Sequence, residues 1–354
     1  MSSVEMSEAP KGSSVNKGRW EFLDAMRGVA AMLVVLQHGT ERWVSWFGQW
    51  TADYFSTGTM GVVAFFLVSG FIIPVSIERA HSLKQFWKRR FLRLAPMFYV
   101  SFLGYLALQS FRPDVAPPLS TYPHLLRFLV GNLLLVQDAA HVPYALVTYW
   151  TLSYEVFFYF LCSVLFAAGL LSRSRLWAWL SLATFLAANV AAALRFHHTL
   201  SAGRVGVVVL AFSATVCYRY SKGLLRLRDV LLLLPALFAV YGVVFWLHYS
   251  VYPVVVPGEA FTRSALGTNL SWIGGLLLFA LFFCLRRFEF PRWLLWLGRI
   301  SYSLYLVHGL VLGFLPKNLS VWIGMPILVA LSLAISHVTF KYIEQPAMDL
   351  GRHA

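Results

Sequence analysis

The first apolar stretch of the chain, residues 22–41, carries the ionisable side chains Asp24, Arg27 and His38 before it ends at Glu41. Such groups are costly in a membrane-spanning helix, so each needs a partner or a function. Arg27 and His38 are eleven residues apart; at about 100° and about 1.5 Å per residue they share one helical face, about 16 Å apart. This face could offer a cation for an anion and, deeper, a histidine for general base catalysis. In the simpler interpretation, Arg27 anchors the helix and pairs with Asp24, while His38 is interfacial.

A second candidate, Glu155, lies near the start of the apolar run 151–171. In the topology below it is on the outer side of the membrane, at a depth similar to that of His38. We expect its carboxylate to orient the imidazole and stabilise the protonated form, as the third member of a catalytic triad does. The alternative is an interfacial carboxylate within an aromatic belt.

A third feature is the basic segment 79–93, whose charges alternate with apolar residues. This pattern predicts an amphipathic helix on the cytoplasmic surface that leads into the next span. Arg90 and Arg93 are three residues apart and therefore share a face. Arginines bind phosphates through paired hydrogen bonds, so a nucleotide-bearing ligand fits, and so do anionic lipid headgroups.

Other polar side chains could line a reaction cavity together with Asp24. Four of them are candidates to stabilise an oxyanion, and the sequence does not choose among them. For His308, in the middle of the run 299–315, the sequence favours the simpler interpretation as a hydrogen-bonded structural group. The candidate cavity-lining residues are Asp24, Ser69, Trp150, Ser153, Tyr302 and His308, of which Ser69, Ser153, Tyr302 and His308 are the oxyanion candidates.

The composition indicates which kind of fold must position these groups. Of the 354 residues, 59% are hydrophobic and 12% are charged, against about 45–50% and about 25% in soluble domains. We therefore expect an all-α integral membrane protein, and disordered, collagen-like and coiled-coil classes are excluded. The net charge of +14 is attributed to cytoplasmic loops rather than to nucleic-acid binding, because no nucleic-acid module is present. No metal-site spacing, HExxH, GxSxG or phosphate-binding glycine loop occurs, so no metal is expected.

Ten runs are long enough to span a bilayer as helices. An eleventh run, 124–137, is shorter and more polar, and could be an extra span or a re-entrant segment. If it does not cross, 22 of the 29 Lys and Arg residues fall on the N-terminal side of the membrane and 7 on the other. This asymmetry predicts ten spans with both termini cytoplasmic. The runs are 22–41, 58–78, 94–111, 151–171, 175–194, 203–219, 229–249, 265–285, 299–315 and 320–341.

The predicted organisation is a membrane domain at 21–348 between two short cytoplasmic segments, a disordered tail at 1–20 and a second tail at 349–354. We expect a multi-pass protein of the bacterial inner membrane, in contact with lipid. The sequence does not indicate an oligomeric state.

Six segments, taken in order, resemble the acyltransferase 3 family of integral membrane acyltransferases. The resemblance covers about residues 20–348 and includes the R-x10-H pattern of Arg27 and His38. Thr151 stands where the family often has Ser, and 156–157 are apolar where many members are polar, which resembles the branch that modifies exopolysaccharides. The segments are 23–38, 65–71, 89–96, 150–159, 300–308 and 342–346.

The resemblance implies transfer of an acyl group, usually acetyl, from cytoplasmic acetyl-CoA or another acyl-CoA to a hydroxyl of a glycan or lipid-linked sugar. Arg27, Arg90 and Arg93 would hold the coenzyme phosphates, His38 would be the general base, and Glu155 would tune it. Three alternatives remain open at this stage. The acceptor could be a small molecule or a signalling oligosaccharide, or the chain could be a non-catalytic transporter of lipid-linked sugar or a structural subunit.

Overall fold

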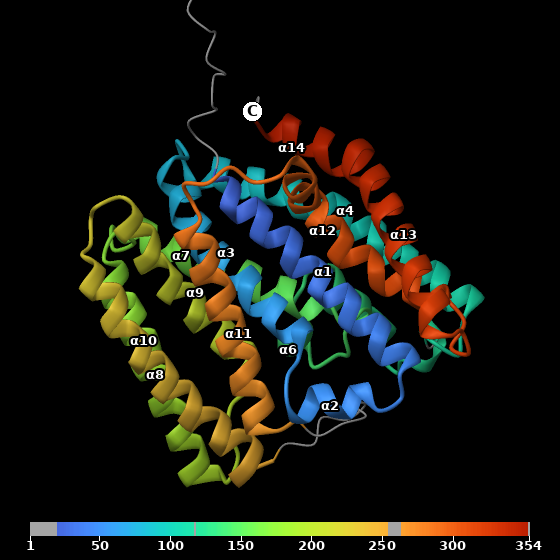
Figure 1. Cartoon of the computed structure of the whole chain (residues 1–354), viewed down its shortest axis with the longest axis horizontal. Coiled ribbons are helices and arrows are strands. Elements are labelled where there is room, and N and C mark those ends of the chain that lie inside the picture. Colours follow the sequence, from blue (N-terminus) through green and yellow to red (C-terminus); the bar gives the residue numbers. More distant parts are fainter. Residues whose placement is uncertain (1–19, 117, 254–262, 353–354) are drawn as a thin grey trace, which may run out of the picture.

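The computed structural model of the chain describes residues 20–116, 118–253 and 263–352, and the regular elements in these ranges are all helical (Figure 1). The predicted tail at 1–20 lies outside the described residues except for Trp20. In chain order the helices are α1 (Glu21–Trp43), α2 (Phe47–Asp53), α3 (Thr57–Glu78), α4 (Leu83–Phe111), a 3₁₀ turn (Leu119–Thr121), α5 (Leu125–Leu133), α6 (Gln137–Ala140), α7 (Tyr149–Ala167), α8 (Ser174–Phe196), α9 (Ala202–Ser221), α10 (Leu227–Trp246) with a π turn (Leu247–Val251), α11 (Ala265–Cys284), α12 (Arg292–Phe314), α13 (Val321–Thr339) with a π turn (Phe340–Glu344), and α14 (Gln345–Arg352).

Nine helices of the described chain are long and apolar enough to cross a membrane, which confirms an all-α membrane bundle. They correspond to nine of the ten predicted spans. The remaining one, at 22–41, forms the 23-residue helix α1. Asp24 and Arg27 dilute its apolar character, and α1 lies among other helices near the centre of the bundle (Figure 1). Its polar groups can therefore face protein rather than lipid.

The segment 124–137 forms α5 and the start of α6. Helix α5 has nine residues and extends for about 14 Å, too short for a hydrocarbon core of about 30 Å. A crossing by this segment as a single helix is therefore excluded, and the number of spans stays a prediction beyond the nine candidate helices of the described chain.

Two segments are longer helices than the sequence predicts. Within the basic segment, residues 83–93 form the first part of α4, which continues without interruption to Phe111, and residues 79–82 form the turn between α3 and α4. At the other end of the chain, α14 continues to Arg352 and packs against α4, so residues 349–352 are helical rather than a free tail. A hydrogen bond connects α14 to α4: the main-chain carbonyl of Gly351 accepts from Nε of Arg89 at 3.2 Å.

Serine caps mark the start of two helices of the site, α3 and α4. The hydroxyl of Ser56 accepts the backbone N–H of Thr59 at 3.0 Å at the start of α3. The hydroxyl of Ser82 does the same for the N–H of Gln85, at 3.2 Å, at the start of α4. Each cap satisfies a donor that the first turn of a helix leaves without a partner.

Four helices form the centre of the bundle. In α3, α9 and α12, 78% of the most apolar stretch is buried, against 22–44% in the other spanning helices. Helix α1 packs between α3 and α12. It approaches α12 closely at two glycines: a Cβ on Gly28 would lie 2.8 Å from the backbone nitrogen of Gly298. In the description below, the "α14 end" is the end of the bundle where α1 begins and α14 lies, and the "α2 end" is the opposite one (Figure 1).

Candidate active site

A cavity of about 590 Å³ lies in the half of the bundle nearest the α14 end. It is enclosed by the first half of α1, the second half of α3, the beginning of α4, part of α7, the first half of α12 and the C-terminal helical turn. Its walls are unusually basic, since seven arginines and three carboxylates line it. These residues are Arg27, Arg79, Arg89, Arg90, Arg93, Arg299 and Arg352, with Asp24, Glu155 and Glu344.

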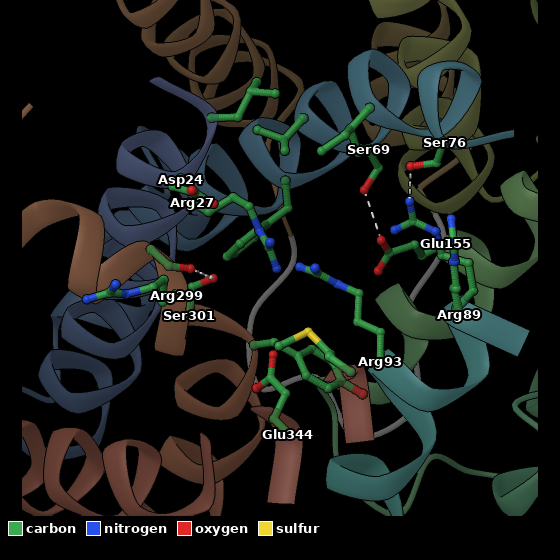
Figure 2. Close-up of a pocket in the computed structure, with 18 of the residues that line it drawn as sticks. Asp24, Arg27, Ser69, Ser76, Arg89, Arg93, Glu155, Arg299, Ser301 and Glu344 are labelled. Carbon is green, nitrogen blue, oxygen red and sulfur yellow. Dashed lines mark hydrogen bonds between the residues drawn. The ribbon is translucent and has the colours of Figure 1, made fainter. Parts of the chain in front are cut away.

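Two of these arginines point into the cavity from opposite walls. The side chains of Arg27 on α1 and Arg93 on α4 extend toward one another, whereas Arg299 points away (Figure 2). Within the described part of the chain, neither Arg27 nor Arg93 donates a hydrogen bond. Two facing guanidinium groups repel each other unless an anion lies between them, and the planar fork of each fits a phosphate or a carboxylate.

Arg90 contacts other side chains of the cavity wall. Its guanidinium donates a hydrogen bond to the hydroxyl of Ser76 on α3. It also lies over the rings of Phe86 and Tyr159, 5.5 Å from each ring centroid. Arg90 and Arg93 therefore share the cavity but differ in their freedom: Arg90 has protein partners, and Arg93 is directed at the open space.

Glu155 lies on the cavity wall among these cations. Its carboxylate accepts hydrogen bonds from the hydroxyl of Ser69 on α3, at 2.9 Å, and from the hydroxyl of Tyr159 one turn further along α7. Because Tyr159 also supports the Arg90 guanidinium, Glu155 and Arg90 are parts of one polar cluster. Spacing could have revealed Tyr159, since residues four apart share a helical face.

A second carboxylate near the arginines is Glu344, at the π turn that follows α13. Its side chain is buried, accepts a hydrogen bond of 2.9 Å from the hydroxyl of Ser303 on α12, and extends into the cavity below Arg27 and Arg93 (Figure 2). A π turn adds a residue to a helical turn and commonly re-aims a side chain at functional sites. Here the turn ends at the residue that supplies this carboxylate.

His38 has a partner other than the predicted one. Its Nδ1 lies 3.0 Å from Nε2 of His308 on α12. The predicted contact between Glu155 and His38 is absent. The helix offsets explain the difference: measured from the α14 end, Ser69, the partner of Glu155, is nine residues or about 14 Å into α3, whereas His38 is seventeen residues or about 26 Å into α1.

Tyr305 connects the basic cavity with the two histidines. It lines the cavity, and its ring centroid lies 6.0 Å from that of His308. Its hydroxyl accepts a hydrogen bond of 3.1 Å from Thr151, one turn before Glu155 on α7. The histidine pair therefore lies behind Tyr305, nearer the α2 end, and neither His38 nor His308 lines the cavity itself.

The remaining predicted cavity residues divide into two groups. Asp24, Ser69 and Tyr302 line the cavity, and the Tyr302 hydroxyl donates to the carbonyl of Leu94 at 2.7 Å. Trp150 and Ser153 do not line it, because they lie on other faces of α7: the Ser153 hydroxyl donates to Gln137 at 2.7 Å, and Trp150 packs on Tyr154. His308 is behind Tyr305 rather than on the cavity wall. Among the residues with described positions, no group of three His, Cys, Asp or Glu side chains is arranged to hold a metal ion.

Comparison with known proteins shows the family of this chain. A family model described as an acyltransferase domain matches residues 20–342. The acyltransferase MdmB of Streptomyces mycarofaciens is 34% identical over 108 residues, which span 29% of this chain and only 27% of MdmB. The exopolysaccharide production protein ExoZ of Rhizobium meliloti (strain 1021) is 26% identical over 332 residues, which span 85% of this chain and 93% of ExoZ.

Proposed function

The chain belongs to this acyltransferase domain family of integral membrane proteins, and from that premise we propose that it transfers an acyl group, acetyl in the simplest case, from an acyl-CoA to a hydroxyl of a glycan or lipid-linked sugar. The observation that carries the proposal is the basic cavity, with Arg27 and Arg93 directed into it. An acyl-CoA bears a phosphomonoester and a pyrophosphate. A polyphosphate between two facing guanidinium groups would offset both their charges and their repulsion.

In this proposal the residues have separate tasks. Arg27 and Arg93 bind the coenzyme phosphates, and Arg90 forms a fixed part of the same cationic wall. Glu155 positions Tyr159, on which the Arg90 guanidinium lies. This task replaces the predicted contact with His38 and keeps Glu155 in the site.

His38 is the proposed general base. It takes the proton of the acceptor hydroxyl as the hydroxyl oxygen attacks the thioester carbonyl carbon. The carbon–sulfur bond then breaks, and the proton passes from His38 to the departing CoA thiolate. Proton transfer of this kind typically contributes about 10²–10⁴-fold to the rate. His38 suits the role because it is the partly exposed member of the histidine pair, whereas His308 is fully buried.

We propose an exopolysaccharide or its lipid-linked precursor as the acceptor, and the bacterial inner membrane as the location. The similarity to ExoZ over 85% of this chain supports the acceptor class. The excess of Lys and Arg on one side supports cytoplasmic termini, so the α14 end with its basic cavity would face cytoplasmic acyl-CoA.

The orientation can be tested separately from the chemistry. Cysteines placed at Ser82 and at Ser320 lie before α4 and α13, at opposite ends of the bundle, and both positions are exposed. In a background with Cys162, Cys217 and Cys284 replaced, an impermeant thiol reagent applied to intact cells should label Ser320→Cys and not Ser82→Cys. The reverse pattern would exclude a cytoplasmic donor.

The activity is tested with radiolabelled acetyl-CoA and membranes that contain the protein, with glycan and lipid fractions counted. His38→Gln should abolish transfer while leaving CoA binding intact. Arg93→Gln removes charge-assisted hydrogen bonds worth about 1.5–3 kcal/mol, so KM for acetyl-CoA should rise about 10- to 150-fold. Arg195→Gln, at the end of α8 and outside the cavity, is the matched control. Absence of both transfer and CoA binding in the wild type would refute the proposal.

A further inference from the structure

The contact between His38 and His308 has the geometry of a hydrogen bond between two ring nitrogens. The two ring planes are 17° apart and their centroids are 5.2 Å apart, while the two nitrogens are separated by 3.0 Å. Nearly coplanar rings at this separation meet edge to edge, which is the geometry of an in-plane N–H···N hydrogen bond. One nitrogen must therefore carry a proton and the other a lone pair.

The main chain identifies which nitrogen of His308 carries a proton. Nδ1 of His308 lies 3.1 Å from the carbonyl oxygen of Leu304, one turn earlier in α12. A carbonyl oxygen can only accept, so Nδ1 must be the N–H that donates to it. In a neutral imidazole the second nitrogen then has the lone pair, so Nε2 of His308 is an acceptor.

A doubly protonated His308 would reverse the direction of the bond, but its surroundings oppose this form. The side chain is fully buried. In the part of the chain that the structure describes, no carboxylate is hydrogen-bonded to it: Nδ1 faces the Leu304 carbonyl, Nε2 faces His38, and the Tyr305 ring lies beside the imidazole. A buried imidazolium without a counter-ion is costly, because the protein does not replace the solvation that the charge loses.

We propose that His308 is a positioning residue that holds His38 in the tautomer with its proton on Nδ1. The lone pair of His308 Nε2 must accept from Nδ1–H of His38, which leaves the lone pair of His38 on its Nε2. That nitrogen is the one directed away from His308, and it is the atom that removes the proton from the acceptor hydroxyl. In water, neutral histidine favours the opposite tautomer, so His308 prepares His38 for its role, as the carboxylate of a serine-protease triad does for its histidine.

The arrangement also explains the use of two helices with a fixed spacing. His38 and His308 each lie ten residues beyond Gly28 and Gly298, where α1 and α12 are in close backbone contact. The two helices run in the same direction, so the glycine contact fixes the depth at which the rings meet. The tautomer itself follows from contacts on α1 and α12 alone, whereas its consequence for catalysis rests on the proposed function.

The first test is nitrogen-15 NMR of the full-length protein in lipid vesicles with labelled histidine. Ring-nitrogen shifts distinguish protonated from unprotonated positions, and the signals of the pair are assigned as those lost in His38→Gln and His308→Gln. We expect both rings to be neutral with the proton on Nδ1, and a coupling between Nδ1 of His38 and Nε2 of His308. A proton on Nε2 of either ring would overturn the proposal, whatever the protein's activity.

The second test separates positioning from mere support of the fold. In His308→Gln the amide oxygen can reach the position of Nε2 and accept from His38, whereas the amide in His308→Asn ends near the position of Nδ1. We expect His308→Asn to lower kcat by about 10²–10⁴-fold, with KM for acetyl-CoA unchanged and with substantial rescue in His308→Gln. Equal losses in both variants, or a change confined to KM, would contradict the positioning role. If NMR finds the proposed tautomers but the wild type transfers no acyl group, the proposed function fails and the tautomer assignment stands.

Discussion

The contact between α1 and α12 can be perturbed by adding one carbon atom, the Cβ of alanine, at Gly298. A Cβ at Gly298 would overlap the backbone carbonyl of Asp24 on α1. Because this neighbour is main chain, it cannot rotate away and the helices must separate. Overpacking typically costs about 1–3 kcal/mol, and an overlap with main chain belongs at the upper end of this range. Alanine recovers about 1 kcal/mol of helix propensity, so Gly298→Ala should destabilise the protein by about 2 kcal/mol.

Helix α12 also provides the matched control. A Cβ at Gly309, directly after His308, would have no neighbour within 4 Å. Gly309→Ala should therefore equal the wild type in stability or exceed it by up to about 1 kcal/mol. Both variants change one glycine to alanine in the same helix, so only the contact with α1 distinguishes them.

The assay is unfolding in mixed micelles, with the midpoint of the transition followed by tryptophan fluorescence. Acyl transfer is measured in parallel, and it should fall in Gly298→Ala because a wider gap weakens the bond between His38 and His308. A Gly298→Ala variant as stable as the wild type would refute the reasoning. So would a Gly309→Ala variant that loses as much stability as Gly298→Ala.

Three further predictions concern charged groups. Glu155→Gln should raise KM for acyl-CoA in steady-state kinetics, because Tyr159 and Arg90 lose their anchor. Glu289→Gln, at an exposed position, is the control and should leave KM unchanged. Equal KM values in the two variants would remove Glu155 from the donor site. Glu78→Gln leaves the buried Arg219 without its carboxylate and should lower the free energy of unfolding by about 3 kcal/mol. Adding Arg219→Met should partly restore this stability. An unchanged midpoint of chemical unfolding in Glu78→Gln would contradict the prediction. Arg112 lowers the pKa of Asp114 through a hydrogen bond, so any stability from this exposed pair is present above the unfolded aspartate value of about 3.9 and is lost as pH falls through the lower folded pKa. Asp114→Asn should therefore unfold like the wild type at low pH, and a difference that persists there would contradict the assignment.

The composition and the order of apolar runs were sufficient to predict the membrane bundle, and the six motif segments were sufficient to indicate the family. A run of about 20 apolar residues has few stable alternatives to a spanning helix, because lipid cannot satisfy backbone hydrogen bonds. The run at 124–137 was ambiguous because its length fits neither a full span nor a simple loop. The structure resolved it as a helix too short to cross.

Spacing within one helix also predicted correctly which residues share a face, but it did not predict their individual tasks. Arg90 and Arg93 both line the cavity, as three-residue spacing implies. Yet Arg90 is bound to Ser76, and Arg93 extends toward Arg27 (Figure 2). That difference depends on which helices stand opposite each side chain.

The partner of His38 was decided only by the tertiary structure. The sequence identified His38 and Glu155 as unusual because charge is costly in an apolar run, and that reasoning needs no fold. The prediction paired them because the expected topology places both near the outer ends of their helices. Relative depth between helices depends on offsets set elsewhere, at contacts such as Gly28 with Gly298, and no local periodicity encodes them. Those offsets place His308 beside His38 and Glu155 among the arginines, so one residue supplies the lone pair that orients the imidazole and the other supports the cationic wall.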